Sequence, residues 1–241
     1  MKLAAPANSN YCATVVQVRS LIELPGLDNL RGLSAFGYQC LVSKDTEIGS
    51  LGLVFPTEVQ LSEAYCAENN LYHRAEMNRD KSQTGYLEDN RRVRAIKLRG
   101  HRSDGLFMPL ESVIWCGNFS ASMLEEGDEF DALNGHEVCR KYVVVRREGQ
   151  SGLKAAPRHE ARVDRKHFPE QFDIDNYFKV QDQFDPNETV VVTQKLHGTS
   201  WRAARVPVTR RLTWVEKVAK RFGAWVQETE YDVVFGSHHV L

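Results

Sequence analysis

Short β-type segments, separated by glycine and proline, recur through the first 145 residues and constrain the fold more than any other feature. Alternating or β-branched patterns predict strands at residues 13–24, 36–43, 51–59, 91–100 and 105–110. Helical spacing of apolar residues predicts one short helix within residues 61–73. Short strands at such close spacing are typical of a small β-barrel, which would end near residues 141–145.

A second unit is predicted beyond a polar linker that contains glycine and proline. We place the linker at residues 146–164, between a first unit at 1–145 and a second at 165–241. Residues 187–194 and 199–206 read as adjacent strands, and residues 231–241 read as a closing strand. Residues 213–227 have helical spacing, with an apolar stripe of Trp214, Val218, Phe222 and Trp225 that we expect in the core. The fold class is therefore a β-rich α+β protein.

Composition sets outer limits on the class of protein. The chain has 241 residues, 42% of them hydrophobic and 26% charged, with a formal net charge of −1. It contains no run of eighteen apolar residues, so we expect no membrane partner. The chain has five cysteines, an odd number, and no two of them form a C-x-x-C pair. This usage favours reduced, mostly buried thiols and a cytoplasmic location.

Basic residues are concentrated in two stretches, although the net charge gives no general argument for binding nucleic acid. The stretches are residues 91–102 and residues 195–221. Each is explained equally well by a solvated face or by a polyanionic partner. In the second reading the candidate phosphate contacts are Arg92, Arg94, Lys97 and Arg99. The aromatic residues Phe36, Tyr38 and Phe107 are either stacking platforms for bases or core residues.

Residues 190–202, VVVTQKLHGTSWR, carry the most specific chemical signal. Lys195 stands at the end of a β-branched run and is followed by Gly198. A lysine that loses its proton through desolvation or nearby cations becomes a nucleophile. A glycine lets the backbone approach a ligand closely, and the hydroxyls of Thr199 and Ser200 can bind a sugar or a phosphate. The alternative is a surface hairpin whose lysine has no chemical role.

The segment VVVTQKLHGTS resembles the first motif of the covalent nucleotidyltransferases, the superfamily of ATP-dependent DNA ligases, RNA ligases and capping enzymes. His197 stands where relatives carry aspartate or histidine. A histidine at this place, rather than an aspartate, resembles the RNA-ligase branch. The preceding FPEQFDIDNYFKV, residues 168–180, resembles the lead-in of that branch. Residues 20–44, 92–110 and 124–142 resemble the OB-fold module of the Deinococcus-type RNA ligases. The resemblance implies an OB-fold-like β-barrel followed by the N-terminal portion of an α+β, ATP-grasp-like nucleotidyltransferase domain.

The resemblance also implies a reaction. Lys195 would attack the α-phosphate of ATP, expel pyrophosphate and form a lysyl-AMP. The AMP would pass to the 5′-phosphate of RNA, and a 3′-hydroxyl would then seal the strand. Mg²⁺ would be expected to neutralise the triphosphate. The residues expected to bind the nucleotide are Gln194, Leu196, His197, Gly198, Ser200, Arg202 and Ser237.

Several of these assignments have open alternatives. His197 is equally well a residue that only shapes the turn, and Arg202 equally well a solvated strand residue. Ser237 belongs to FGSHHVL, which resembles the second family motif, with His238 or His239 in place of the expected cation. Adjacent side chains on a strand point to opposite faces, so no metal site is predicted at the two histidines.

The family also needs further motifs downstream of these two, and the sequence up to Leu241 contains no candidates for them in the required order. We therefore expect an incomplete catalytic domain, in which full ligation by residues 1–241 alone is improbable. The second functional class that fits the sequence is a non-catalytic OB-fold RNA-binding protein, or an inactive ligase remnant.

Overall fold

The computed structural model describes residues 2–117, 120, 123–143, 162–164, 166–169, 174–192 and 201–236, together with the backbone of Ser237. The chain divides into two compact units. One unit comprises residues 1–145 and 175–185, and the other comprises residues 146–174 and 186–241. Residues 175–185 thus belong with the first unit, although the sequence analysis grouped them with the second.

The described residues form a β-rich mixed structure of several small antiparallel sheets, none of which closes on itself. The central sheet of the first unit has the order β10-β6-β2-β11, from β2 (Ala13–Gln17), β6 (Leu51–Pro56), β10 (Gly105–Pro109) and β11 (Glu129–Phe130). A second sheet has the order β3-β4-β5, from β3 (Ile22–Glu23), β4 (Leu30–Ala35) and β5 (Tyr38–Ser43). The backbone N–H of Asp104 donates to the carbonyl of Gln39, which joins β5 to the chain that enters β10.

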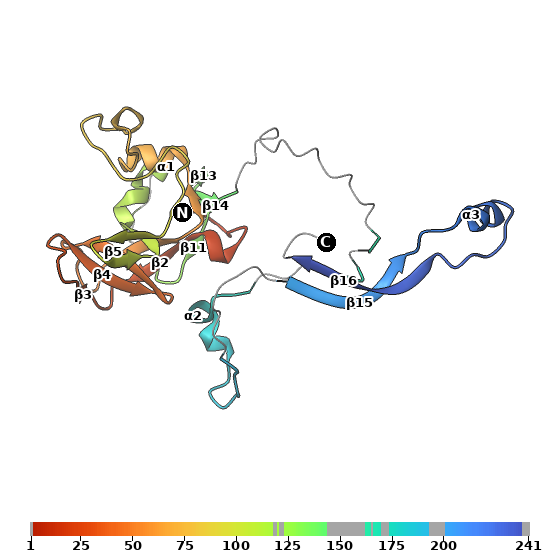
Figure 1. Ribbon diagram of the computed structural model, residues 1–241. Coiled ribbons are helices and arrows are strands. Elements are labelled where there is room, and N and C mark those ends of the chain that lie inside the picture. The colour runs from red at the N-terminus through yellow and green to blue at the C-terminus, as the bar shows by residue number, and fades with distance from the viewer. Residues whose placement is uncertain are drawn as a thin grey trace. The chain divides into compact units, whose positions relative to one another are not determined.

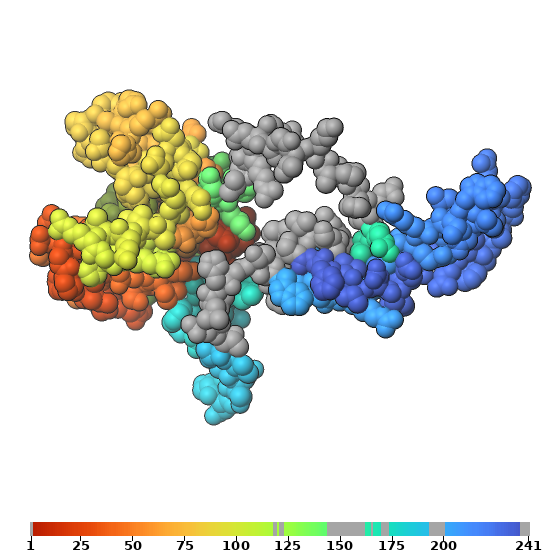
Figure 2. Space-filling model, viewed as in Figure 1, coloured from red at the N-terminus to blue at the C-terminus, as the bar shows by residue number. Residues whose placement is uncertain are grey.

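The remaining elements of the first unit are short. Three small sheets are formed by β1 (Leu3–Ala4), β12 (Ala132–Leu133) and β13 (His136–Glu137), by β7 (Val59–Leu61) and β14 (Cys139–Lys141), and by β8 (Ile96–Leu98) and β9 (His101–Ser103). The helices are α1 (Glu63–Glu68), α2 (Tyr177–Val180), and the 3-10 turns η1 (Ser9–Tyr11), η2 (Ala75–Met77), η3 (Leu110–Cys116) and η5 (Gln181–Gln183). In the space-filling view the atoms from β1 to β14 form one continuous body (Figure 2).

Strands β2 and β6 are buried on both faces, which explains their nearly continuous apolar sequences. Val15 and Leu53 face the larger core cluster, together with Phe55 and Phe130. The alternate positions face a smaller cluster shared with the second sheet, made of Val16, Val18, Leu33, Cys40, Val42 and Val54. The sheet β3-β4-β5 therefore covers one face of the central sheet, and the larger cluster fills the other.

A tight turn between β4 and β5 bears directly on the site described below. Ala35 pairs with Tyr38, so Phe36 and Gly37 form a two-residue loop. Both have positive φ, 50° and 76°, which is the backbone of a type I′ hairpin turn. Glycine adopts this conformation freely, whereas Phe36 is held in it by its surroundings.

The second unit contains one long hairpin, in which β15 (Trp201–Thr209) pairs along its whole length with β16 (Thr229–Ser237) (Figure 1). Its alternate residues Val206 and Val208 bury against Val163 and Phe168, so one face of the hairpin carries a small core. The helix α3 (Trp214–Arg221) lies in the connection between the two strands. It starts with a capping box, in which Thr213 and Glu216 satisfy each other's backbone N–H groups.

The predicted apolar stripe of this helix is not in the core, and that prediction is wrong. Trp214, Phe222 and Trp225 are 78%, 85% and 86% exposed, and Val218 is 37% exposed. Periodicity shows that one face is apolar, but burial also needs an opposing element, and none of the described residues covers this face.

Two strand predictions also differ from the structure. The described part of the strand predicted at residues 187–194, residues 187–192, forms no strand, and Val191 and Val192 lie exposed. A β-branched run becomes a strand only against a hydrogen-bonding neighbour. Of residues 91–100, only Ile96–Leu98 form a strand. The five cysteines are free and buried, as the sequence predicts.

Candidate functional site

The core of the predicted nucleotide motif lies outside the described residues. This applies to Gln194, Lys195, Leu196, His197, Gly198 and Ser200, and in the last motif to His238 and His239. The structure does describe the chain that follows the first of these gaps, with Arg202 near the start of β15. It also describes the chain that precedes the second gap, with the backbone of Ser237 at the end of β16.

The hairpin brings these two flanks together. In its register Trp201 lies opposite Ser237, and Arg202 lies opposite Gly236. Directly opposed residues of an antiparallel pair have Cα atoms about 4.5–5.5 Å apart. The chain that leaves the lysine motif and the chain that enters the FGSHHVL motif are therefore neighbours at one end of a single hairpin.

Arg202 has a defined packing environment in the second unit. Its guanidinium carbon lies 4.5 Å from the centre of the Phe168 ring, within the range of a cation–π contact. Phe168 is only 4% exposed and packs with Val163, Val206 and Val208. The small core under the hairpin therefore holds the one predicted nucleotide-binding side chain that the structure describes.

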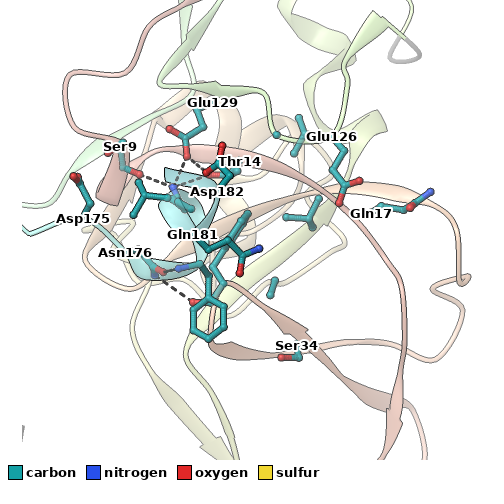
Figure 3. A pocket seen from close by; sticks show the side chains of 18 of the residues that line it. Ser9, Thr14, Gln17, Ser34, Glu126, Glu129, Asp175, Asn176, Gln181 and Asp182 are labelled. Atoms are coloured by element: carbon teal, nitrogen blue, oxygen red, sulfur yellow. Dashed lines mark hydrogen bonds and ion pairs between the residues drawn. The ribbon is translucent and has the colours of Figure 1, made fainter. Parts of the chain in front are cut away.

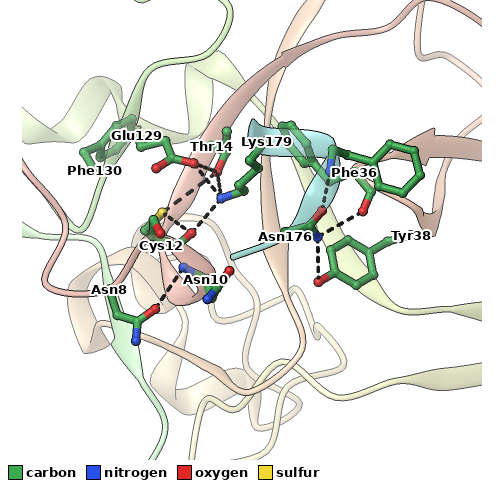
Figure 4. A network of polar contacts seen from close by, with 12 residues as sticks. Asn8, Asn10, Cys12, Thr14, Phe36, Tyr38, Glu129, Phe130, Asn176 and Lys179 are labelled. Atoms are coloured by element: carbon green, nitrogen blue, oxygen red, sulfur yellow. Dashed lines mark hydrogen bonds and ion pairs between the residues drawn. The ribbon is translucent and has the colours of Figure 1, made fainter. Parts of the chain in front are cut away.

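A second polar cluster, in the first unit, was not predicted from the sequence. Its centre is Lys179 on α2, whose side chain is 13% exposed. The ammonium group donates to the Ser9 carbonyl at 2.6 Å, to Thr14 Oγ1 at 3.2 Å and to Glu129 Oε1 at 2.5 Å (Figure 4). These three acceptors match the three donors of an ammonium group. Its nitrogen also lies 5.3 Å from the centre of the Phe36 ring.

Asn176 and Phe178 complete the attachment of this segment. Asn176 Nδ2 donates to the Phe36 carbonyl and to the Tyr38 hydroxyl, both at 3.2 Å, and its Oδ1 caps α2 by accepting from the Phe178 N–H (Figure 4). The Phe178 ring lies against Gly37, where a Cβ atom would be 2.5 Å from Phe178 Cε2. We call residues 175–185 the docking segment.

The docking segment forms one wall of a cavity of about 770 Å³ in the first unit. Figure 3 shows side chains from η1, β2, the β4–β5 turn and the docking segment around it. Its charged lining residues are Arg19, Glu126, Glu129, Asp175, Lys179 and Asp182. Both cations are already paired, Arg19 with Glu126 and Lys179 with Glu129. The excess of carboxylates disfavours a phosphate ligand in this cavity.

The four predicted RNA contacts have different environments. Arg92 is paired with Glu58 at 2.5 Å and stacks over the Tyr142 ring, so its charge is used within the protein. Arg94 lies 3.9 Å from Glu88.

The other two predicted contacts belong to the β8–β9 hairpin. Lys97 is exposed and lies opposite Arg102, a basic residue that the sequence analysis did not single out. Arg99, at its tip, donates to the Gly26 carbonyl. Lys97 is therefore the better placed of these residues for a phosphate, and Arg92 the worst placed.

The buried cysteines are poor nucleophiles. Burial raises the pKa of the thiols of Cys40, Cys66 and Cys116 to about 12, from an ordinary 9.0. Within the described part of the chain, no group of three or more His, Cys, Asp or Glu side chains is arranged to hold a metal ion. The described helices include none that is long and apolar enough to span a membrane.

No protein-family model matches the chain, and no curated protein matches it. Its structural neighbours include an RNA ligase of Naegleria gruberi with PPi, at a TM-score of 0.47 and 16% identity, covering 93% of this chain and 73% of the other. A mutant of that ligase with ATP and Mn gives 0.46 and 15%, covering 95% and 74%. Another mutant, with AMP and Mn, gives 0.37 and 18%, covering 54% and 34%.

In that last comparison the chain spans about a third of the neighbour's length.

Proposed function

We propose that the chain belongs to an ATP-dependent RNA ligase, in which Lys195 becomes covalently bound to AMP. The observation that carries the proposal is the register of the β15–β16 hairpin. It makes neighbours of Trp201, six residues after Lys195, and Ser237, within the second motif. Two segments that resemble separate parts of one nucleotide pocket thus share one end of a single structural element.

In the proposed reaction the unprotonated Lys195 amine attacks the α-phosphorus of ATP. An N–P bond forms, the bond to the pyrophosphate oxygen breaks, and pyrophosphate leaves with the electron pair. Arg202, held over the Phe168 ring, would orient a nucleotide oxygen, and the Ser237 hydroxyl is a second candidate contact. The AMP would then pass to an RNA 5′-phosphate, which a 3′-hydroxyl attacks with release of AMP.

Mg²⁺ is part of the proposal through the resemblance alone. When bound, it would neutralise charge on the triphosphate. The described residues present no carboxylate cluster suited to it, so no step is assigned to it here.

We propose further that residues 1–145 are an OB-fold-type RNA-binding module, followed by a linker at 146–164 and the nucleotidyltransferase portion at 165–241. The support is the core shared by β2, β4, β5 and β6, because in a small barrel the strands surround one apolar interior. In this proposal RNA phosphates contact Lys97 and Arg99 first, with Arg94 beside them. Arg92 is the weakest candidate, since Glu58 already neutralises it.

The proposal is tested by incubating the protein with α-labelled ATP and Mg²⁺ and separating it on a denaturing gel. A covalent label is expected, and it should vanish in Lys195→Ala but persist in Lys166→Ala, a change of an exposed lysine in the second unit. An unlabelled protein that still binds RNA in a salt-sensitive manner would instead identify a non-catalytic RNA-binding protein.

A further inference from the structure

The connection between β15 and β16 presents three aromatic side chains to solvent. Trp214, Phe222 and Trp225 are each more than three-quarters exposed. Val218 lies four residues after Trp214 and four before Phe222, so these side chains share one face of α3. The helix ends at a turn in which Gly223 has positive φ, and Trp225 follows directly after it. An exposed apolar face of this kind marks an interaction site.

Basic residues border this face along one edge. Lys217 and Arg221 follow Trp214 by three and seven residues, which places both beside it on the helical repeat. Both are exposed, and neither has an acidic partner among the described residues. Two positive charges therefore stand in line next to an exposed indole ring.

The acidic residues of the connection do not weaken this edge. Glu216 pairs with Arg210 at 2.5 Å, and Glu228 pairs with Lys220 at 2.7 Å. Glu216 follows Trp214 by two residues and so points away from the apolar face. The connection has five basic residues against these two acidic ones, which favours a polyanionic partner.

A single strand of RNA has the complementary surface. Its flat bases stack on exposed aromatic rings, and its phosphates bind a neighbouring line of cations. A membrane surface fits less well, because binding there increases with the apolar area that is inserted, and α3 has only eight residues. The exposed side chains are also mainly flat rings, which suit stacking more than insertion.

We propose that Trp214, Phe222 and Trp225 stack on the unpaired bases of a single-stranded RNA whose phosphates contact Lys217 and Arg221. That the strand is RNA rests on the proposed function, whereas the binding itself needs no ATP. The surface lies beyond the end of the hairpin at which β15 runs into the connection (Figure 1). The flanks of the two nucleotide motifs lie at the other end, about 26 Å away along the nine-residue strand.

The test is the fluorescence anisotropy of a labelled, unstructured RNA of about twelve nucleotides, titrated with the protein. Trp214→Ala and Trp225→Ala should each weaken binding by about five-fold or more, because each removes a ring that stacks on a base. Trp214→Phe should retain most of the affinity. Trp214→Leu should lose it, because leucine is apolar but cannot stack.

The salt dependence of binding tests the basic edge. In the double variant Lys217→Ala with Arg221→Ala, the slope of log K against log salt concentration should become shallower by about 1.4, which corresponds to two lost phosphate contacts. The matched controls are Lys220→Ala, which removes a lysine already paired with Glu228, and Tyr231→Ala, which removes an exposed ring on β16. Both should bind RNA as the wild type does.

Three results would overturn the inference. The first is equal binding by the wild type and Trp214→Leu. The second is equal affinity for the same strand in a duplex, where the bases are not available for stacking. The third is binding to vesicles of phosphatidylserine and phosphatidylcholine without binding to RNA, which would identify a membrane surface.

The proposed function fails or stands separately. A protein that binds RNA through α3 but takes no label from ATP would refute the ligase and support this inference. A labelled protein whose RNA binding ignores every change on α3 would support the ligase and refute this inference.

Discussion

Phe168 should control nucleotide affinity through Arg202, although it is expected to touch no nucleotide itself. The Arg202 guanidinium lies 4.5 Å from the centre of a ring that is only 4% exposed. Replacing Phe168 with leucine keeps an apolar side chain in the cluster with Val206 and Val208, and removes the aromatic face. The substitution thus tests whether that contact orients Arg202 for ATP.

The magnitude follows from the geometry. Cation–π contacts contribute about 0.5–1 kcal/mol at exposed sites and about 2 kcal/mol when desolvated. With a buried ring the effect should lie in the upper part of this range, which corresponds to a loss in ATP affinity of about 5- to 30-fold. Because leucine is smaller than phenylalanine but keeps the site apolar, the free energy of unfolding should fall by about 1–2 kcal/mol.

The assay is isothermal titration with ATP, with Val163→Ala as the matched control. Val163 belongs to the same cluster and is 8% exposed, so its truncation loosens the packing but leaves the ring under Arg202. We expect weaker ATP binding in Phe168→Leu and a smaller effect in Val163→Ala. The reasoning fails if Phe168→Leu binds ATP within two-fold of the wild type, or if Val163→Ala weakens binding equally.

Three further predictions concern stability and ionisation. Gly85→Ala should lower the free energy of unfolding of the first unit by about 3 kcal/mol, because the new Cβ would lie 2.2 Å from the Leu71 carbonyl oxygen. The measurement is urea unfolding, and an unchanged urea midpoint would contradict the prediction. Hydrogen bonds from Arg210 and Thr213 lower the pKa of the Glu216 carboxyl from 4.5 to about 2. The stabilisation of α3 by the ionised carboxylate is therefore complete above pH 4.5 and is lost as the pH falls through about 2. An NMR titration in which this carboxyl shows its ordinary pKa would refute the prediction. The Cys66 thiol, with a pKa of about 12, should resist a thiol reagent at pH 8 in the native protein and react after denaturation; fast native reaction would show that it is not buried.

The sequence predicted the local features of the first unit well, because these follow from short-range patterns. The apolar runs of β2 and β6 and the strand at β10 lie within predicted strands, and α1 lies within the predicted helix. By contrast, the hydrogen bonds of Lys179 to Ser9, Thr14 and Glu129 join residues 50 and more positions apart, and no local pattern encodes such pairs. Of the docking segment, only residues 175–180 were recognised, as the end of the lead-in to the lysine motif.

The helix in the hairpin connection shows the opposite limit. Its amphipathic spacing predicted a helix, and α3 forms with a capping box at Thr213. The same spacing predicted burial of Trp214 and Phe222, and both are exposed. Which residues share a face is set by the helical repeat, whereas their burial depends on a partner that the sequence of the helix does not specify. The same reasoning applies to Arg92, whose Glu58 partner is 34 positions away.

Lys195 and its immediate neighbours remain a prediction from the sequence, and one measurement tests them directly. The protein is incubated with ATP and Mg²⁺, digested, and its peptides are examined by mass spectrometry for a covalently attached AMP. The account predicts AMP on the peptide that contains Lys195, linked through the lysine nitrogen and released by acid. AMP on a different lysine, or on none while ATP is still bound, would contradict it.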